Sequence, residues 1–225
     1  MRIIKLISFP FVVLLSVIIL VAAGCRGGDH KTKAEPVIPE KKFDSTYLFN
    51  GISLDGWEIT NFGPQGPVSV SGGEIILGMG DGCTGINYTR EVPSKDYEIS
   101  LEVRRREGND FFCGLTFPVG NNFCTFIAGG WGGPITGLSC IDGKDASENE
   151  TTTMRNFEKN RWYAIRLSVV ENKIEVWIDE EKVVDFLTDG KKLSIRPEVN
   201  LSKPLGIASW NTTAGIRNIR LKDKS

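Results

Sequence analysis

Hydrophobic and polar residues alternate along several short segments of the chain beyond residue 43. In the segment 97–103, every second residue is Tyr, Ile, Leu or Val, and the residues between them are Glu or Ser. The side chains of a β-strand point to opposite faces in turn, so this period predicts a strand with one buried face. The same period runs through residues 163–169 and 174–178. Beyond residue 43, no stretch repeats apolar residues at the three- and four-residue spacing of an amphipathic helix.

The turns between these segments are short and polar, such as VENK at 170–173 and DEEK at 179–182. Closely spaced strands joined by such turns are typical of an antiparallel sandwich or jelly roll. The folded part of the chain is therefore predicted to be all-β.

If the three alternating segments lie in one sheet, the face opposite the core is charged and carries one indole ring. Its members are Glu98, Glu102, Arg104, Arg166, Glu175 and Trp177. The face could be a solvated back of the sheet, on which acids and arginines pair across strands for about 0.2–1 kcal/mol each. It could also form the floor of a sugar site, because Trp177 offers a platform for the apolar face of a sugar ring. The sequence leaves both roles open.

The first 24 residues are predicted to be an export signal. A short basic start, MRIIK, precedes an apolar run over residues 6–23, which ends in Ala-Ala-Gly-Cys. This ending resembles the lipobox of bacterial lipoproteins, in which the signal is cleaved before a cysteine that carries the lipid. We therefore expect Cys25 to be lipidated and the protein to be anchored in the cell envelope, in the periplasm or at the outer membrane. An uncleaved membrane anchor and simple secretion are the alternatives.

Residues 25–42 are rich in Gly, Lys, Pro and Glu and are predicted to be a flexible tether. Residues 43–225 have the length of one domain with its own core. The formal charge of −1 falls to −3 when Arg2 and Lys5 leave with the signal. Nucleic acid is therefore not an expected partner, and contact with the membrane is expected through the lipid anchor only. The oligomeric state is not predicted.

Histidine and cysteine restrict the chemistry of the domain. The single histidine, His30, lies in the tether, so a Ser-His-Asp triad and a histidine metal site are excluded from residues 43–225. No cofactor is expected. The domain cysteines show no CxxC spacing, and in an exported chain this favours disulfides over zinc, with buried free thiols as the alternative. They are Cys83, Cys113, Cys124 and Cys140.

The stretch LFNGISLDGWE at 48–58 closely resembles the opening of the 3-keto-disaccharide hydrolase domain family, in which LFNG and polar residues precede GW. Four further motifs follow in the order in which the family has them. They are EVR at 102–104 with Gly114 beyond it, RWYAIRLSV at 161–169, IEVWIDEEKV at 174–183, and PLGIASWNTTAGIRNIRLK at 204–222. The resemblance covers residues 47–222. It implies a concanavalin-like jelly roll of two packed sheets, in agreement with the alternation.

The resemblance also implies a hydrolase or lyase that cleaves 3-keto-glycosides. A ketone at C3 of a sugar acidifies the proton on C2, so a base can remove it and the enolate then expels the group on C1. This needs a base, a group that stabilises the enolate and an acid for the leaving oxygen. On the charged face, the expected catalytic residues are Glu102, Arg104 and Glu175, and the expected substrate-binding residues are Arg166 and Trp177. The alternative is a non-catalytic carbohydrate-binding module on the same fold.

The segment Trp131–Thr152 departs from the family pattern. Family members commonly carry an Asn-Ser-Gly turn and then a Glu-x-Gln strand, where this chain has FFCGLTF at 111–117 and the segment 131–152. We expect this segment to form a wall of the sugar site, with Trp131 and Asp142 in contact with the substrate. Asp145, Glu148 and Glu150 are the further acids that could enter the cleft. A polar surface loop is one alternative. A calcium loop is another, because Asp142, Asp145 and Ser147 offer hard oxygen ligands.

Overall fold

The alternating segments of the sequence are neighbouring strands of one antiparallel sheet. They form β6 (Tyr97–Gly108), β11 (Tyr163–Val170) and β12 (Lys173–Ile178) in the computed structural model, which describes residues 46–225. In the register, Ile165 of β11 lies between Leu101 of β6 and Ile178 of β12, so the apolar positions share one face. The three segments thus lie in one sheet, which is the condition on which the charged face depends.

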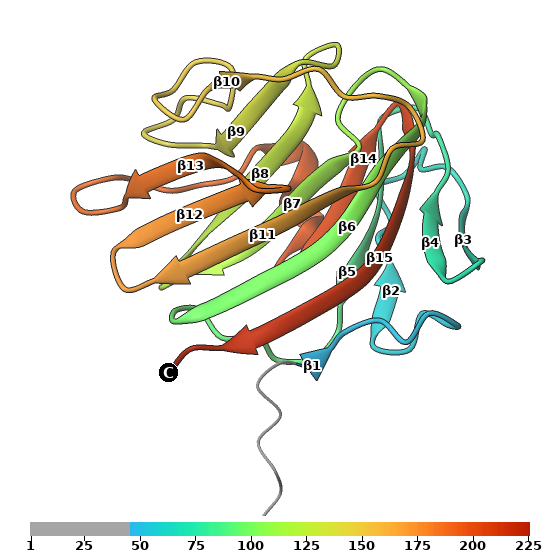
Figure 1. The fold of residues 1–225 in the computed structure, drawn as a ribbon, viewed down its shortest axis with the longest axis horizontal. Helices are drawn as coiled ribbons and strands as arrows, with labels where there is room; N and C mark the ends of the chain where they lie inside the picture. Colours follow the sequence, from blue (N-terminus) through green and yellow to red (C-terminus); the bar gives the residue numbers. More distant parts are fainter. Residues whose placement is uncertain (1–45) are drawn as a thin grey trace, which may run out of the picture. The chain divides into compact units, whose positions relative to one another are not determined.

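This first sheet has the order β13-β12-β11-β6-β15-β4-β3, with β1 beside β15 (Figure 1). Its other strands are β1 (Thr46–Tyr47), β3 (Val68–Ser71), β4 (Glu74–Leu77), β13 (Glu181–Leu187) and β15 (Thr212–Asp223). The long strands β6 and β15 lie side by side at the centre of the sheet.

The second sheet has the order β10-β9-β8-β7-β14-β5-β2 and packs face to face with the first. Its strands are β2 (Trp57–Ile59), β5 (Cys83–Tyr88), β7 (Cys113–Val119), β8 (Asn122–Gly130), β9 (Ile135–Ser139), β10 (Thr153–Met154) and β14 (Gly206–Trp210). One short 3₁₀ helix, η1 (Pro197–Ser202), precedes β14.

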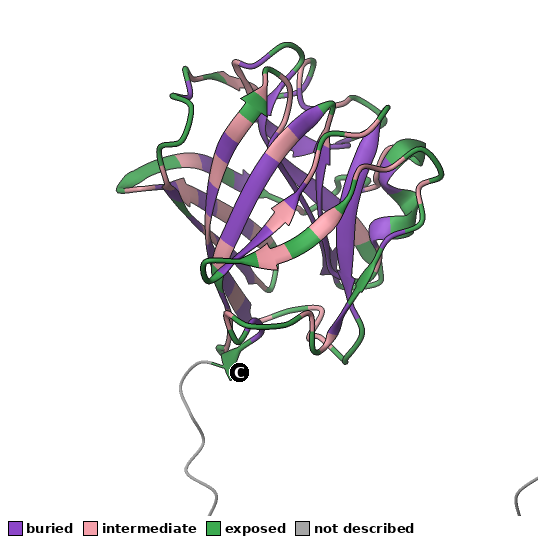
Figure 2. Ribbon diagram, turned by 90° about the vertical axis from the view of Figure 1, so that its right-hand side faces the viewer, coloured by how far each residue is buried: buried purple, intermediate pink, exposed green. Residues whose placement is uncertain are grey.

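The core lies between the two sheets. Ile99 and Leu101 of the first sheet and Phe117 and Phe126 of the second are almost completely buried. Figure 2 shows that the strands of both sheets are largely buried, with exposed positions mainly at the turns and edges. The fold is an all-β jelly-roll sandwich, as the sequence predicts.

The segment 131–152 is more regular than its glycine-rich sequence suggests. Its first part contains β9, which pairs with β8 on one side and β10 on the other. The prediction of one long excursion is therefore wrong over residues 135–139. A tight turn in which Trp131, Gly132 and Gly133 all have positive φ joins β8 to β9, so the glycines belong to this turn and not to a long loop.

The prediction of a disulfide is wrong for the domain that the structure describes, since Cys83, Cys113, Cys124 and Cys140 are free and buried. The register pairs Cys113 with Ala128 and Cys124 with Phe117, so the two cysteines lie four residues apart along adjacent strands. This separation is roughly 13 Å at the rise of a β-strand, which a disulfide cannot span. Burial raises the pKa of Cys113 and Cys124 to about 12, and both pack as small apolar side chains.

The signal, the tether and Cys25 lie outside the described residues. Within residues 46–225, no helix has the length and apolar character that a membrane crossing requires.

Candidate functional site

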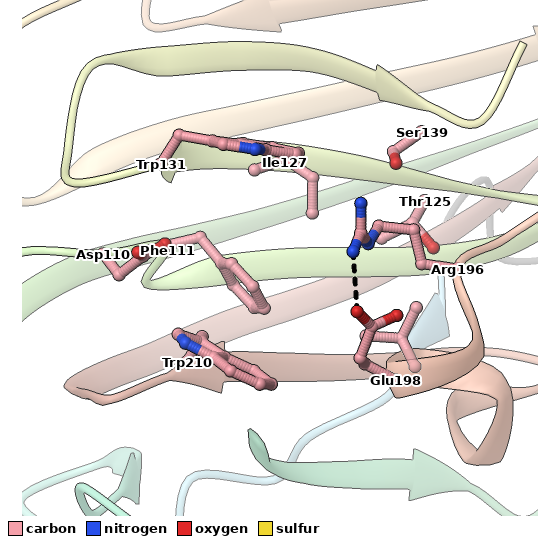
Figure 3. Close-up of a pocket in the computed structure, with 10 residues that line it drawn as sticks. Asp110, Phe111, Thr125, Ile127, Trp131, Ser139, Arg196, Glu198 and Trp210 are labelled. Carbon is pink, nitrogen blue, oxygen red and sulfur yellow. Dashed lines mark hydrogen bonds and ion pairs between the residues drawn. The ribbon is translucent and has the colours of Figure 1, made fainter. Parts of the chain in front are cut away.

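A pocket of about 230 Å³ opens on the outer face of the second sheet, across β7, β8, β9 and β14 (Figure 3). The residues that line it are Asp110, Phe111, Thr125, Ile127, Trp131, Ser139, Arg196, Glu198, Val199 and Trp210. It therefore combines aromatic rings, charged groups and small hydroxyl side chains.

The pocket forms where small residues occupy the outward positions of the second sheet. Leu115 and Phe117 of β7 belong to the core, so Gly114 and Thr116 between them face outward. On the neighbouring strand β8, Thr125 lines the pocket, and its hydroxyl lies 2.9 Å from that of Thr116. Because these side chains do not fill the outer face, space remains for a ligand.

Three aromatic residues stand around this floor. Phe111 and Trp210 are partly buried, and the backbone N–H of Trp210 donates to the Phe111 carbonyl at 3.0 Å. Trp131, in the turn after β8, is 40 % exposed. In Figure 3 the Phe111 and Trp210 rings lie next to each other on one side of the pocket, and Trp131 lies on another. Rings in this arrangement offer apolar faces on two sides of a ligand.

An arginine and a glutamate lie at the start of η1. Arg196 Nη2 donates to Glu198 Oε1 at 2.7 Å, and Arg196 Nη1 donates to Asp145 Oδ2 at 2.8 Å. The bond from Arg196 lowers the pKa of Glu198 below its ordinary value of 4.5, and the carboxylate of Glu198 raises the pKa of Arg196 in return. Both groups are therefore ionised at neutral pH, and Figure 3 shows the guanidinium inside the pocket.

The position of η1 is fixed by contacts with β5 and β14. The side chain of Asn87 on β5 donates to the carbonyls of Leu201 and Lys203 and accepts a hydrogen bond from Thr60 Oγ1 at 2.6 Å. A Cβ at Gly206 would lie only 2.5 Å from the Ser202 carbonyl oxygen, so this close approach requires glycine. These contacts hold Glu198 in place at the pocket wall.

Asp110 is the second carboxylate of the pocket. Its Oδ1 accepts the backbone N–H of Phe111 at 2.7 Å, and its Oδ2 accepts that of Gly132 at 3.2 Å. Arg105 on β6 is a buried cation whose pKa is lowered by burial and raised in part by the charge of Asp110. Asp110 therefore links the turn before β7 to the turn that carries Trp131.

The structure brings the predicted charged residues together, but on the outer face of the first sheet and away from this pocket. Glu102 accepts hydrogen bonds from Arg217 at 2.6 and 2.8 Å and from Asn218 at 2.6 Å. Partial burial acts to raise the pKa of Glu102, and the bonds from Asn218 and Arg217 outweigh it and lower the pKa. Arg104 donates to Glu74 at 3.1 Å and lies 4.5 Å from the centre of the Trp162 ring.

The other members of this face are also paired. Glu175 accepts from Lys182 at 2.6 Å and lies 3.2 Å from Lys173, and the bond from Lys182 lowers the pKa of Glu175. The guanidinium carbon of Arg166 lies 3.5 Å from the centre of the Trp177 ring, so it covers one face of the indole. The catalytic and binding roles of these residues stay predictions. The geometry favours the pocket on the second sheet as the functional site.

Of the predicted residues in the segment 131–152, Trp131 lines the pocket, whereas Asp142 is not among the lining residues. Asp142 Oδ1 accepts the Lys192 N–H at 2.9 Å, and its Oδ2 lies 3.5 Å from Lys191 Nζ. Among residues 46–225, no group of three or more His, Cys, Asp or Glu side chains could hold a metal ion.

Sequence reasoning missed Phe111, Arg196, Glu198 and Trp210. Two features of the sequence could have indicated the floor of the pocket and Trp210, whereas none indicated Arg196 and Glu198. One is the run of small residues at the outward positions of β7 and β14, and the other is a tryptophan at the end of a strand in the closing family motif, PLGIASWN.

Comparison with known proteins gives a family and a fold. The family model described as "3-keto-alpha-glucoside-1,2-lyase-like domain" matches residues 44–222. Among curated protein sequences, none matches the chain.

Several solved structures share the fold at low identity. A protein assigned as a glycosyl hydrolase from Parabacteroides distasonis ATCC 8503 is 17 % identical, with a TM-score of 0.55 over 81 % of this chain and 94 % of that one. A laminarinase from Flavobacterium sp. UMI-01 is 11 % identical, with a TM-score of 0.54 over 80 % and 98 %. The carbohydrate esterase vb_24B_21 of bacteriophage phi24B is 14 % identical, with a TM-score of 0.54 over 80 % and 100 %. At these identities the likeness concerns the fold alone.

Proposed function

The chain belongs to the family of 3-keto-alpha-glucoside-1,2-lyase-like domains, and from this premise we propose that the pocket on the second sheet is a glycan site. One observation carries the proposal: Phe111, Trp131 and Trp210 share a pocket with the ion pair of Arg196 and Glu198. A sugar ring has an apolar C–H face and hydroxyl groups at its edge. Aromatic rings and ionised groups that meet in one pocket complement both parts.

We further propose that the chain cleaves 3-keto-glycosides at this site. The carboxylate of Glu198 takes the proton from C2, and the electron pair of the C–H bond moves towards the C3 ketone, whose oxygen becomes an enolate. The ketone then re-forms as the bond between C1 and the leaving oxygen breaks. The products are an enone and the free aglycone, and water can add to the enone afterwards.

The ionisation states of Glu198 and Arg196 support these roles. Glu198 is a carboxylate at neutral pH and can accept the proton, and the pKa that Arg196 lowers makes it a weaker base than an unpaired glutamate. Once Glu198 has taken the proton it no longer carries a charge, so the Nη2 group of Arg196 that it engaged can donate to the ketone oxygen as negative charge develops there. Once it is protonated, Glu198 can return the proton to the leaving oxygen. Asp110, which accepts two backbone N–H groups, is placed to orient the substrate.

A non-catalytic carbohydrate-binding module is the second candidate, and a specific observation favours it. Each carboxylate that lines the described pocket already accepts a hydrogen bond, Glu198 from Arg196 and Asp110 from the backbone. The pKa of Glu198 is lowered, whereas a general acid needs a raised one. A module would use the same rings and the same ion pair to bind a sugar without turnover.

The two candidates are separated by incubation of the protein with aryl 3-keto-glucosides and with the parent aryl glucosides. We expect release of the aryl group from the keto compounds only, and calorimetry with the parent glucosides should show binding. Binding without release from any keto-sugar would favour the module. Neither binding nor release would contradict the glycan site.

We also propose that the domain is tethered to the cell envelope through a lipid on Cys25. This rests on the apolar run and the AAGC sequence, which lie outside the described residues. Cys25→Ala should leave an uncleaved precursor and abolish labelling by a fatty-acid probe. Normal processing and labelling of this variant would exclude the lipoprotein assignment.

A further inference from the structure

Arg196 is held between two carboxylates that come from different parts of the chain. Glu198 lies two residues further along and accepts at 2.7 Å, and Asp145 reaches Arg196 from the loop after β9 and accepts at 2.8 Å. Both terminal nitrogens of the guanidinium are thus engaged with carboxylates. An arginine in this state presents little free positive charge to a ligand.

The loop that carries Asp145 is fixed to the sheet beneath it. Asn149 is buried, and its Nδ2 donates to the carbonyls of Leu138 and Asp145, each at 2.7 Å. Asp145 Oδ1 accepts the backbone N–H of Ser147 at 2.9 Å and its hydroxyl at 2.6 Å. The side chain of Asp145 is only 17 % exposed. Its carboxylate therefore has a defined position next to Arg196.

The charges do not balance at the end of the pocket where Arg196 lies. Asp145 and Glu198 together carry two negative charges against the single positive charge of Arg196. At the other end, Asp110 is opposed by the buried cation Arg105. A ligand that carries a carboxylate would meet a net negative charge at Arg196, whereas an uncharged ring would not.

We propose that Asp145 is a specificity-determining residue that neutralises Arg196, so that the pocket selects uncharged sugar rings over rings with a carboxylate. The proposal rests on the glycan site proposed above. Without Asp145, the Nη1 group of Arg196 is released and can bind the carboxylate of a uronic acid.

The test compares methyl glucoside with methyl glucuronide, which differ only in the oxidation of C6 to a carboxylate. We expect the wild type to bind the glucoside more tightly. In Asp145→Asn, the ratio of the two Kd values should shift towards the glucuronide by about 5- to 20-fold, as expected for one unit charge at a partly exposed site. Glu148→Gln is the matched control, because it removes the same charge from an exposed position of the same loop and should leave the ratio unchanged.

A measurement on the wild type keeps the proposal testable if Asp145→Asn does not fold. The preference for the glucoside should weaken as the salt concentration rises, because salt screens the repulsion of the glucuronide. A wild type that binds both rings equally, or a preference that neither Asp145→Asn nor salt changes, would overturn the role of Asp145. If the wild type binds neither ring, the glycan site itself is wrong.

Discussion

Exchange of Glu198 for glutamine is expected to slow release of the aryl group from a 3-keto-glucoside by about 10²–10⁴-fold. Glutamine keeps the size of the side chain and can still accept a hydrogen bond from Arg196, but it cannot take the proton from C2. The side chains of Glu198 and Arg196 are 39 % and 41 % exposed, so the melting temperature should change little. Single-turnover rates and thermal unfolding of the two proteins measure the two effects separately.

Glu102→Gln is the matched control on the first sheet. Glu102 is bound to Arg217 and Asn218, and its exchange should weaken these bonds at a cost of no more than about 1 kcal/mol, with the rate unchanged. The opposite result, in which Glu102→Gln loses activity and Glu198→Gln retains it, would move the catalytic site back to the charged face that the sequence indicates.

The pH profile of the rate gives a further check on Glu198. Only the carboxylate form accepts the proton, and Arg196 holds the pKa of Glu198 below 4.5. The rate should therefore fall only as the pH drops below 4.5 and Glu198 becomes protonated. Arg196→Gln removes the group that lowers this pKa, so the acid limb of the profile should move to higher pH.

The alternating strands could be predicted from the sequence because each buries one face and exposes the other. In β6 this contrast is complete over Tyr97–Arg104, where buried and half-buried residues alternate. The strands that carry the pocket lack this contrast between a buried face and a more exposed one. All seven residues of β7 are buried, and its outward Gly114 and Thr116 are small. A strand without a polar face predicts no site, so the sequence indicated the charged face of the first sheet instead.

The wall of the pocket could not be predicted for a different reason. Arg196 and Glu198 lie in a short stretch before η1 whose sequence, SIRPEV, has no periodic pattern. Their position depends on Asn87 of β5 and on the close approach at Gly206, which are contacts between distant parts of the chain. Local sequence carries no information on such contacts. The disulfide prediction was wrong for the same reason. The distance between Cys113 and Cys124 is set by the register of β7 and β8, which the local sequence does not give.

The largest expected change in binding is that of Trp210→Ala, which should raise the Kd of a bound glucoside by about 30-fold or more, or roughly 2 kcal/mol. Trp210 ends β14, and its ring lies beside that of Phe111 at the pocket (Figure 3). Alanine removes the platform on which the sugar ring is proposed to stack. Trp210→Phe keeps a smaller aromatic face and should retain part of the affinity. Thermal unfolding of both variants distinguishes loss of the platform from loss of the fold.

Trp177→Ala is the comparison that decides between the two faces of the molecule. The indole of Trp177 is already covered by Arg166, so its removal should cost packing on the first sheet and leave the Kd of the glucoside within about twofold. If Trp177→Ala weakens binding and Trp210→Ala does not, the sugar lies on the charged face. If Trp210→Ala alone weakens binding, the small outward residues of the second sheet are the floor of the site, and the charged face is a set of cross-strand pairs.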